Sequence, residues 1–147
     1  MAHTTIPAYV KFLVSNLKER PGLSTIDIHG GPPIASTAQK GSKLWFGDVK
    51  GEQSWVSIAR SVNPKEENYT VDGVIDIIAT TRDMDSVVDA AFAILAEVED
   101  HLRANPDQGI THVIWSGING PIEHYKRRSD QVAQCVIYFG IEVKARI

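Results

Sequence analysis

The sequence predicts an α+β domain with a mostly antiparallel sheet and two amphipathic helices packed on one face of the sheet. Two segments carry apolar residues at helical spacing, and several others alternate apolar and polar residues as strands do. The predicted strands follow one another without helices between them, which excludes a doubly wound α/β fold. A length of 147 residues without an internal repeat or linker indicates a single domain, residues 1–147.

The first helix is predicted around Pro7, because proline suits the first turn of a helix, and it ends before Pro21-Gly22. Residues at helical spacing form its apolar stripe: Ile6, Val10, Leu13, Val14 and Leu17. A strand is predicted at Ser24–His29. The polar residues that follow predict an exposed loop at Ala35–Ser42.

The middle of the chain predicts three extended segments. Lys43–Val49 is the first, and Gln53–Val62, with a less regular alternation, is the second. Asn63–Asn68 is predicted to be a charged turn. Tyr69–Thr80 has the clearest alternation and is therefore expected to be a central strand.

The second helix has the strongest boundary signals in the chain. Asp83 or Asp85 can cap its start, and Asn105-Pro106 ends it. Its apolar residues step by three and four along one face: Val88, Ala91, Leu95, Val98 and Leu102.

Two further strands complete the prediction. They are Ile110–Ile118 and the long Gln131–Ile147, with a loop at Asn119–Asp130 between them. Every second residue from Ala133 to Ile147 is apolar, which predicts one buried face for the last strand. Cys135, the only cysteine, falls on this face and is expected to be a small core residue and not a catalytic thiol.

The residues that usually carry chemistry do not form a recognisable motif. The five histidines show no metal-ligand spacing, and the glycines lack the spacing of a phosphate-binding loop, so no cofactor or metal is predicted. Asp27 and His29 share one side of a strand, and a carboxylate there can orient the imidazole as in a catalytic dyad. No nucleophile motif accompanies them, so an exposed strand face is the favoured interpretation and the chain is not predicted to be an enzyme.

Charge is divided unevenly along the chain, although the net charge is only −3. Residues 1–65 carry eight Lys/Arg against four Asp/Glu, residues 66–107 two against eleven, and residues 108–147 five against three. An acidic element between two basic ends can favour association between copies through complementary fields. The alternative is that the acidic stretch is simply the solvated face of one helix.

Lys126-Arg127-Arg128 is the one dense basic cluster. It fits contact with nucleic-acid phosphates or with an acidic protein surface, or it is an ordinary loop tip. The net negative charge argues against a dedicated DNA-binding protein. The residues predicted to form an interface are Lys40, Lys43, His124, Tyr125, Lys126, Arg127 and Arg128.

Over nearly its full length the chain resembles the tail-terminator (tail-completion) proteins of long-tailed bacteriophages. The segments that carry the resemblance are Thr4-Thr5-Ile6-Pro7, Arg20-Pro21-Gly22-Leu23, Gly31-Pro32-Pro33, the Trp55 segment, Tyr69-Thr70-Val71, Ala91–Glu99 and Val143-Lys144-Ala145-Arg146-Ile147. The loop Gly117–Asp130 matches no pattern of that family.

The resemblance implies a structural protein of the virion, assembled in the host cytoplasm and located at the head-proximal end of the tail. Such proteins form a ring, typically six-fold, on the last layer of the tail tube. The ring stops polymerisation of the tube, offers a surface to the head or neck connector, and leaves a channel through which DNA passes without sequence-specific binding. The implied partners are other copies of the chain, the tail tube protein and the connector protein, with no membrane involved.

Three other functions stay open from the sequence. Another neck or head-completion protein would also be a small ring-forming subunit. A small hydrolase or ligand-binding domain would use Asp27, His29 or His124, and requires a deep pocket lined by these groups. A nucleic-acid module built on Lys126–Arg128 requires binding to generic DNA that depends steeply on salt.

Overall fold

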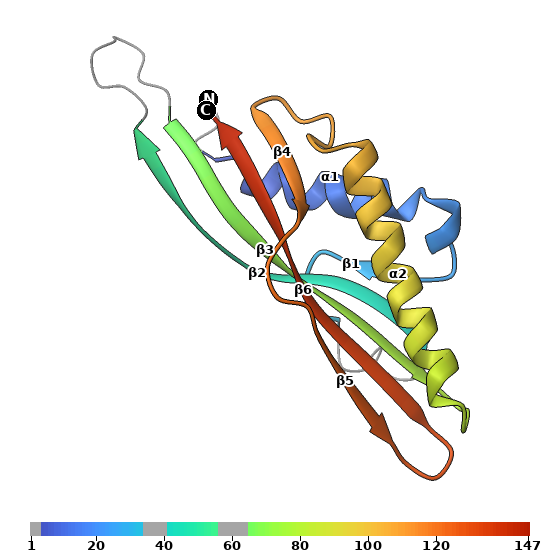
Figure 1. Cartoon of the computed structure of the whole chain (residues 1–147). Coiled ribbons are helices and arrows are strands. Elements are labelled where there is room, and N and C mark those ends of the chain that lie inside the picture. The colour runs from blue at the N-terminus through green and yellow to red at the C-terminus, as the bar shows by residue number, and fades with distance from the viewer. Residues whose placement is uncertain (1–3, 34–40, 56–64) are drawn as a thin grey trace.

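The structure is a computed structural model that describes residues 4–33, 41–55 and 65–147. One six-stranded sheet is covered on one face by two helices, which confirms the predicted α+β class (Figure 1). In chain order the elements are α1 (Ile6–Lys18), the short 3₁₀ helix η1 (Pro21–Leu23), β1 (Asp27–His29), β2 (Gly41–Trp55), β3 (Lys65–Ala79), α2 (Met84–Ala104), β4 (Val113–Ile118), β5 (Glu123–Arg128) and β6 (Ala133–Arg146).

The strands lie in the order β1-β2-β3-β6-β4, and β5 also pairs with β6. β1 and β2 are parallel, while the other pairs are antiparallel, so the sheet is mixed but largely antiparallel as predicted. β4 and β5 share one edge of β6. β4 pairs along residues 141–145 and β5 along residues 133–138.

Both helices turn their apolar stripes toward the sheet, as the spacing predicts. α1 buries Tyr9, Leu13 and Leu17 and leaves the other predicted positions partly buried. α2 is capped by Asp83, whose carboxylate accepts a hydrogen bond from the Ser86 amide at 3.3 Å. Its buried residues are Val87, Ala91, Ile94, Leu95, Val98, His101 and Leu102, and the predicted Val88 is partly buried against the same core.

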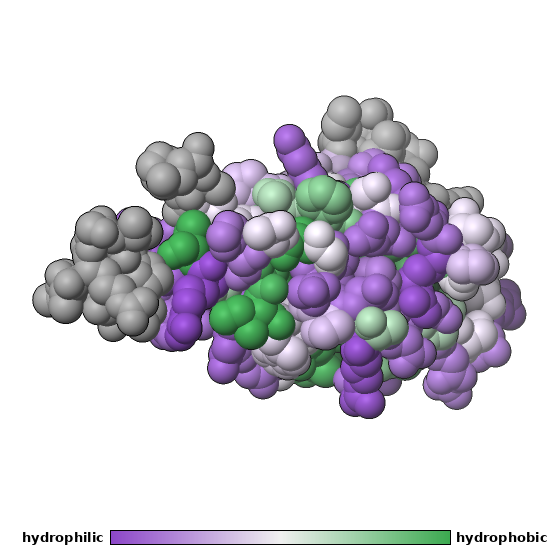
Figure 2. Space-filling model, turned by 90° about the horizontal axis from the view of Figure 1, so that it is seen from above, coloured by the Kyte–Doolittle hydropathy of each residue, from purple (hydrophilic) through white to green (hydrophobic). Residues whose placement is uncertain are grey.

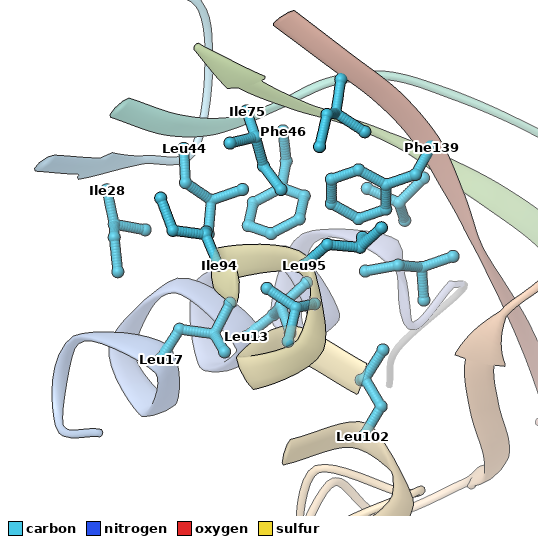
Figure 3. Packing of buried hydrophobic residues seen from close by; sticks show 14 of the residues in the cluster. Leu13, Leu17, Ile28, Leu44, Phe46, Ile75, Ile94, Leu95, Leu102 and Phe139 are labelled. Atoms are coloured by element: carbon cyan, nitrogen blue, oxygen red, sulfur yellow. The ribbon is translucent and has the colours of Figure 1, made fainter. Parts of the chain in front are cut away.

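The core fills the space between the helices and one face of the sheet. Leu44, Phe46, Ile75 and Phe139 extend from the strands, and leucine and isoleucine side chains of α1 and α2 meet them (Figure 3). The Phe46 and Phe139 rings pack edge to face with centroids 6.4 Å apart. Cys135 is buried on the same face of β6, as predicted, and burial raises the pKa of its thiol.

Three sequence predictions about strands and turns were wrong. The predicted loop at 119–130 contains β5, because the first half of β6 offers an unpaired edge with which residues 123–128 form a ladder. Residues 65–68 of the predicted charged turn belong to β3, since their backbone pairs with both β2 and β6. Residues 41–55 form one continuous strand, so Gly41 and Ser42 belong to β2 and not to a loop.

Part of the prediction falls on residues that the structure does not describe. These are residues 35–40 of the predicted loop, including Lys40, and residues 56–62 of the second extended segment. Neither helix in the described ranges combines the length and apolar character that crossing a bilayer requires.

Candidate interface on the open face of the sheet

Strand pairing divides the basic cluster between the two faces of the sheet. In the β5–β6 ladder, Lys126 lies opposite Cys135 and Arg127 opposite Gln134. Because Cys135 is buried against the helices, Lys126 falls on that helix-covered face, and so do His124 and Arg128 two residues to either side. Glu123, Tyr125 and Arg127 fall on the other face, which we call the open face.

The residues of β5 on the helix-covered face contact α2 and the turn before it. The His124 ring packs edge-on against Phe92 of α2, with ring centroids 5.4 Å apart. Arg128 donates a hydrogen bond from its guanidinium to the Arg82 carbonyl at 2.8 Å. Part of the basic cluster therefore lies beside the acidic start of α2 within one chain.

On the open face, aromatic side chains from neighbouring strands meet. Tyr125 and Tyr138 pack edge to face with centroids 5.7 Å apart, and both are about half exposed. The Tyr125 hydroxyl donates to Glu123 at 3.0 Å, and this hydrogen bond to a carboxylate raises the pKa of Tyr125. Val136 of the adjacent strand β6 belongs to the same face, and so does Trp45 of β2, which is three strands away from β5.

These aromatic side chains line a hollow that crosses the open face from β5 to β2. The residues around it are Trp45, Asp76, Glu123, Tyr125, Lys126, Arg127, Gln134, Val136 and Tyr138. Asp76 accepts a hydrogen bond from Gln134 at 3.0 Å, and Glu123 accepts the one from Tyr125. Arg127 makes no salt bridge or side-chain hydrogen bond within residues 4–33, 41–55 and 65–147. The hollow therefore combines aromatic surface with two carboxylates and with two cations, Lys126 and Arg127, that form no salt bridge in the described part of the chain.

A second hollow adjoins the first and shares Glu123 and Tyr138 with it. Asp48 and Asp72 add two exposed carboxylates, while Gly140, opposite Asp72, contributes no side chain that could fill the space. The open face is thus concave along the middle of the paired strands β3 and β6.

The remaining predicted interface residues occupy different environments. Lys43 is in β2 opposite Asp76 and is only 4 % exposed, so it is not a surface cation in this structure. Lys40 lies outside the described residues. The predicted set therefore comes together only in part: Tyr125, Lys126 and Arg127 border the hollow, and His124 and Arg128 contact the helix side.

The alternative catalytic pair is brought together without a surrounding site. His29 Nε2 lies 2.9 Å from Asp27 Oδ2, so the strand does place the two side chains side by side. Neither residue borders the two hollows of the open face or three others on the described surface, and the same holds for His124. Within that part of the chain, no group of three His, Cys, Asp or Glu residues is placed to hold a metal ion.

Sequence reasoning missed a buried carboxylate. Glu67 of β3 is 2 % exposed and accepts hydrogen bonds from the Thr5 amide (2.8 Å), the Thr5 hydroxyl (2.7 Å) and the Gln53 amide (2.7 Å), and also from Thr4. Burial alone would raise the pKa of Glu67, but these hydrogen bonds outweigh it and hold the pKa below its ordinary value.

The Thr5 hydroxyl also lies 2.9 Å from the Tyr69 hydroxyl, and burial raises the pKa of Tyr69 to about 12. The network fixes the start of α1 to the β2–β3 ribbon. No sequence signal separates Glu67 from the exposed charges on either side of it.

At the end of the molecule seen from above, hydrophilic side chains dominate and hydrophobic ones form separate areas among them (Figure 2). This is the usual appearance of a protein surface. Aromatic residues from β2, β5 and β6 gather instead around the open-face hollow, which makes that face the best candidate for an interface.

Comparison with known proteins finds similarity in fold but not in sequence. No protein-family model matches the chain, and no curated protein sequence matches it. Among solved structures, a chain of the virion of a native gene transfer agent (GTA) particle is similar with a TM-score of 0.59 and 10% sequence identity. The similarity covers 98% of this chain and 100% of that chain, so the two share a fold over their whole length.

Proposed function

We propose that this chain is a structural protein of a phage-like virion that caps the tail tube as a ring. The ring ends polymerisation of the tube and provides the docking surface for the head or neck connector. The observation that carries the proposal is the end-to-end similarity in fold to a chain of a GTA virion. The resemblance of the sequence to tail-terminator proteins, which extends over nearly its full length, suggests the specific role.

The shape of the domain is compatible with such a ring. A closed ring of identical chains requires two different surfaces on each chain, one for each neighbour. The helices cover one face of the sheet and leave the other open (Figure 1), so two chemically different faces point in opposite directions. The ring we propose is six-fold, sits at the head-proximal end of the tail, and surrounds a channel through which DNA passes.

Imaging the purified protein tests the role directly. The protein is added to purified tail tubes and, separately, to purified DNA-filled heads, and each sample is examined by negative-stain electron microscopy. A tail terminator is expected to form rings at tube ends and to stop further growth of the tubes. Binding to heads alone would reassign the chain to another neck or head-completion protein, and binding to neither would contradict a role at this joint.

Charge reversal of the basic cluster tests whether β5 takes part. Lys126→Glu, Arg127→Glu and Arg128→Glu together are expected to weaken ring formation or docking, because they replace three exposed cations with anions. The monomer is expected to stay folded, since these side chains lie outside the core, and circular dichroism checks this. Normal tail assembly by the triple variant in an infection-complementation assay would exclude β5 from the interface.

A further inference from the structure

Two exposed surfaces of the chain face in opposite directions. The buried residues of α2 point toward the sheet, so the opposite side of the helix, which we call the outer face of α2, points away from it. The open face of the sheet points the other way, because the helices cover only the opposite face (Figure 1). Surfaces placed in this way can join copies front to back.

The outer face of α2 is acidic and closely approachable. Exposed residues recur along it at intervals of three and four: Asp85, Asp89, Ala93, Ala96, Asp100 and Arg103. Arg103 is paired with Glu99 at 3.0 Å, whereas Asp85, Asp89 and Asp100 make no salt bridge in the described part of the chain. The two alanines in the middle allow another backbone or aromatic side chain to come close.

The open-face hollow has the complementary chemistry. Two carboxylates, Asp76 and Glu123, and two cations, Lys126 and Arg127, line it, and neither cation forms a salt bridge among the described residues, so both are free to pair with a carboxylate of another copy. Tyr125, Tyr138 and Trp45 supply aromatic surface beside them. Arginine and aromatic residues grouped in a hollow are the residue types that dominate binding energy at protein interfaces.

We propose that the open-face hollow of one copy receives the outer face of α2 from the next copy. Arg127 would pair with the carboxylates at the start of that helix, and the tyrosines would pack against its alanines. The contact uses a different surface on each partner, so repetition closes a ring or grows a filament. This inference rests on the proposed function, since it names the contact by which the ring forms.

The first test reverses the charge of Arg127 and measures self-association of the full chain by sedimentation, alone and with tail tubes. Arg127→Glu is expected to raise the concentration for half-assembly about tenfold or more, because it places an anion opposite the acidic helix. Lys144→Glu is the matched control. It makes the same charge change on the same face but outside the hollow, and it is expected to leave assembly nearly unchanged.

A charge exchange tests the identity of the partner surface. The chain carrying both Arg127→Asp and Asp89→Arg is expected to recover most of the assembly that each single change loses. Equal effects of Arg127→Glu and Lys144→Glu, or failure of the exchange to restore assembly, would overturn the contact.

Cross-linking tests the same contact without changing a charged pair at its centre. Glu123→Cys and Ala96→Cys in one chain place thiols on opposite sides of the molecule, so a disulfide between them can form only between copies. Mild oxidation is expected to give a ladder of covalent oligomers, and either single cysteine variant is expected to give dimers at most. The native Cys135 is buried and does not compete.

The outcomes separate this contact from the proposed function. Rings at tube ends that are insensitive to Arg127→Glu and give no ladder would overturn the contact but leave the capping function standing. Loss of tube binding with unchanged self-association would assign the open face to the tube protein, which also overturns the contact. A chain that neither self-associates nor binds tubes would overturn both.

Discussion

At Glu67, burial and hydrogen bonding act on the same carboxylate in opposite directions. Four donors from the two residues before α1 and from β2 surround this side chain, and they favour its ionised form more strongly than burial disfavours it. α1 has no acidic residue in its own first turn, so Glu67 supplies from β3 the negative charge that the start of a helix favours. One residue thus links the ribbon to the helix.

Glu67→Gln is expected to destabilise the protein by about 1–3 kcal/mol, because a buried amide cannot accept from all four donors. Glu66→Gln is the neighbouring control. Glu66 forms an exposed salt bridge with Arg146, and its replacement is expected to cost less than about 1 kcal/mol. Urea unfolding at pH 7 measures both, and equal costs would contradict the structural role of Glu67.

The same carboxylate predicts a dependence of stability on acid. The folded-state pKa of Glu67 lies below the ordinary value of 4.5, so its ionised form stabilises the folded protein above that pH. This contribution is lost as the pH falls through the folded-state pKa. The difference in unfolding free energy between the native protein and Glu67→Gln is therefore expected to shrink below pH 4.5. A difference that stays constant over the acid range would be inconsistent with the lowered pKa.

Gly73 leaves room for an aromatic ring. A β-carbon placed on Gly73 would lie 2.3 Å from Cζ of Phe139, which is buried and packed against Phe46. Gly73→Ala is expected to cost about 1–3 kcal/mol, because the ring must move within a packed core. Gly31→Ala, where a β-carbon meets nothing within 4 Å, is the control and is expected to be close to neutral in thermal unfolding.

Among the elements, β5 and α2 show where sequence patterns suffice and where they fail. α2 could be predicted because a capping aspartate, an apolar stripe and a terminating Asn-Pro pair all agree. β5 could not, since all six of its residues are exposed and none is aliphatic, so no alternation marks it as a strand. It is a strand because β4 pairs only with residues 141–145 of β6, so the backbone of residues 133–138 on the same edge is available to pair with β5.

The candidate site was hard to predict for the same reason, because part of it lies on β5. The cluster of Lys126, Arg127 and Arg128 is visible in the sequence, but a loop assignment predicts that all three point outward together. The ladder with β6 instead puts Arg127 and its two neighbours on opposite faces of the sheet, and the order of the strands brings Trp45 of β2 to the same hollow as Arg127. Register between strands decides such juxtapositions, and a single sequence does not reveal it.

The cap of α2 provides a prediction about one element. Asp83→Ala is expected to cost about 1 kcal/mol, because the Ser86 amide loses its acceptor at the start of the helix. Asp100→Ala changes an exposed acid near the other end of the same helix, and it is expected to be neutral or slightly stabilising because acids are unfavourable there. Thermal unfolding compares the two, and a smaller loss for Asp83→Ala than for Asp100→Ala would argue against the cap.

For the whole molecule, the order of strands in space differs from their order in the chain. The fold class and the layer of two helices on one face could be predicted, since both follow from the periodicity of separate segments. The parallel β1–β2 pair and the edge shared by β4 and β5 could not, because they depend on which segments meet in space. The pairing of β5 with β6 supplies the Glu123, Tyr125 and Arg127 side of the open-face hollow.

The position of β6 also has a consequence for biosynthesis. β3, β4 and β5 all pair with β6, yet all three precede it in the chain and are therefore made first by the ribosome. Until residues 133–146 emerge, β3 has an open edge and the apolar face of α2 lacks half of its sheet. We expect a nascent chain that stops after residue 128 to be digested rapidly by protease, and one that includes β6 to resist. Protection of the shorter chain would mean that the domain folds progressively, although the structure indicates closure in a single late step.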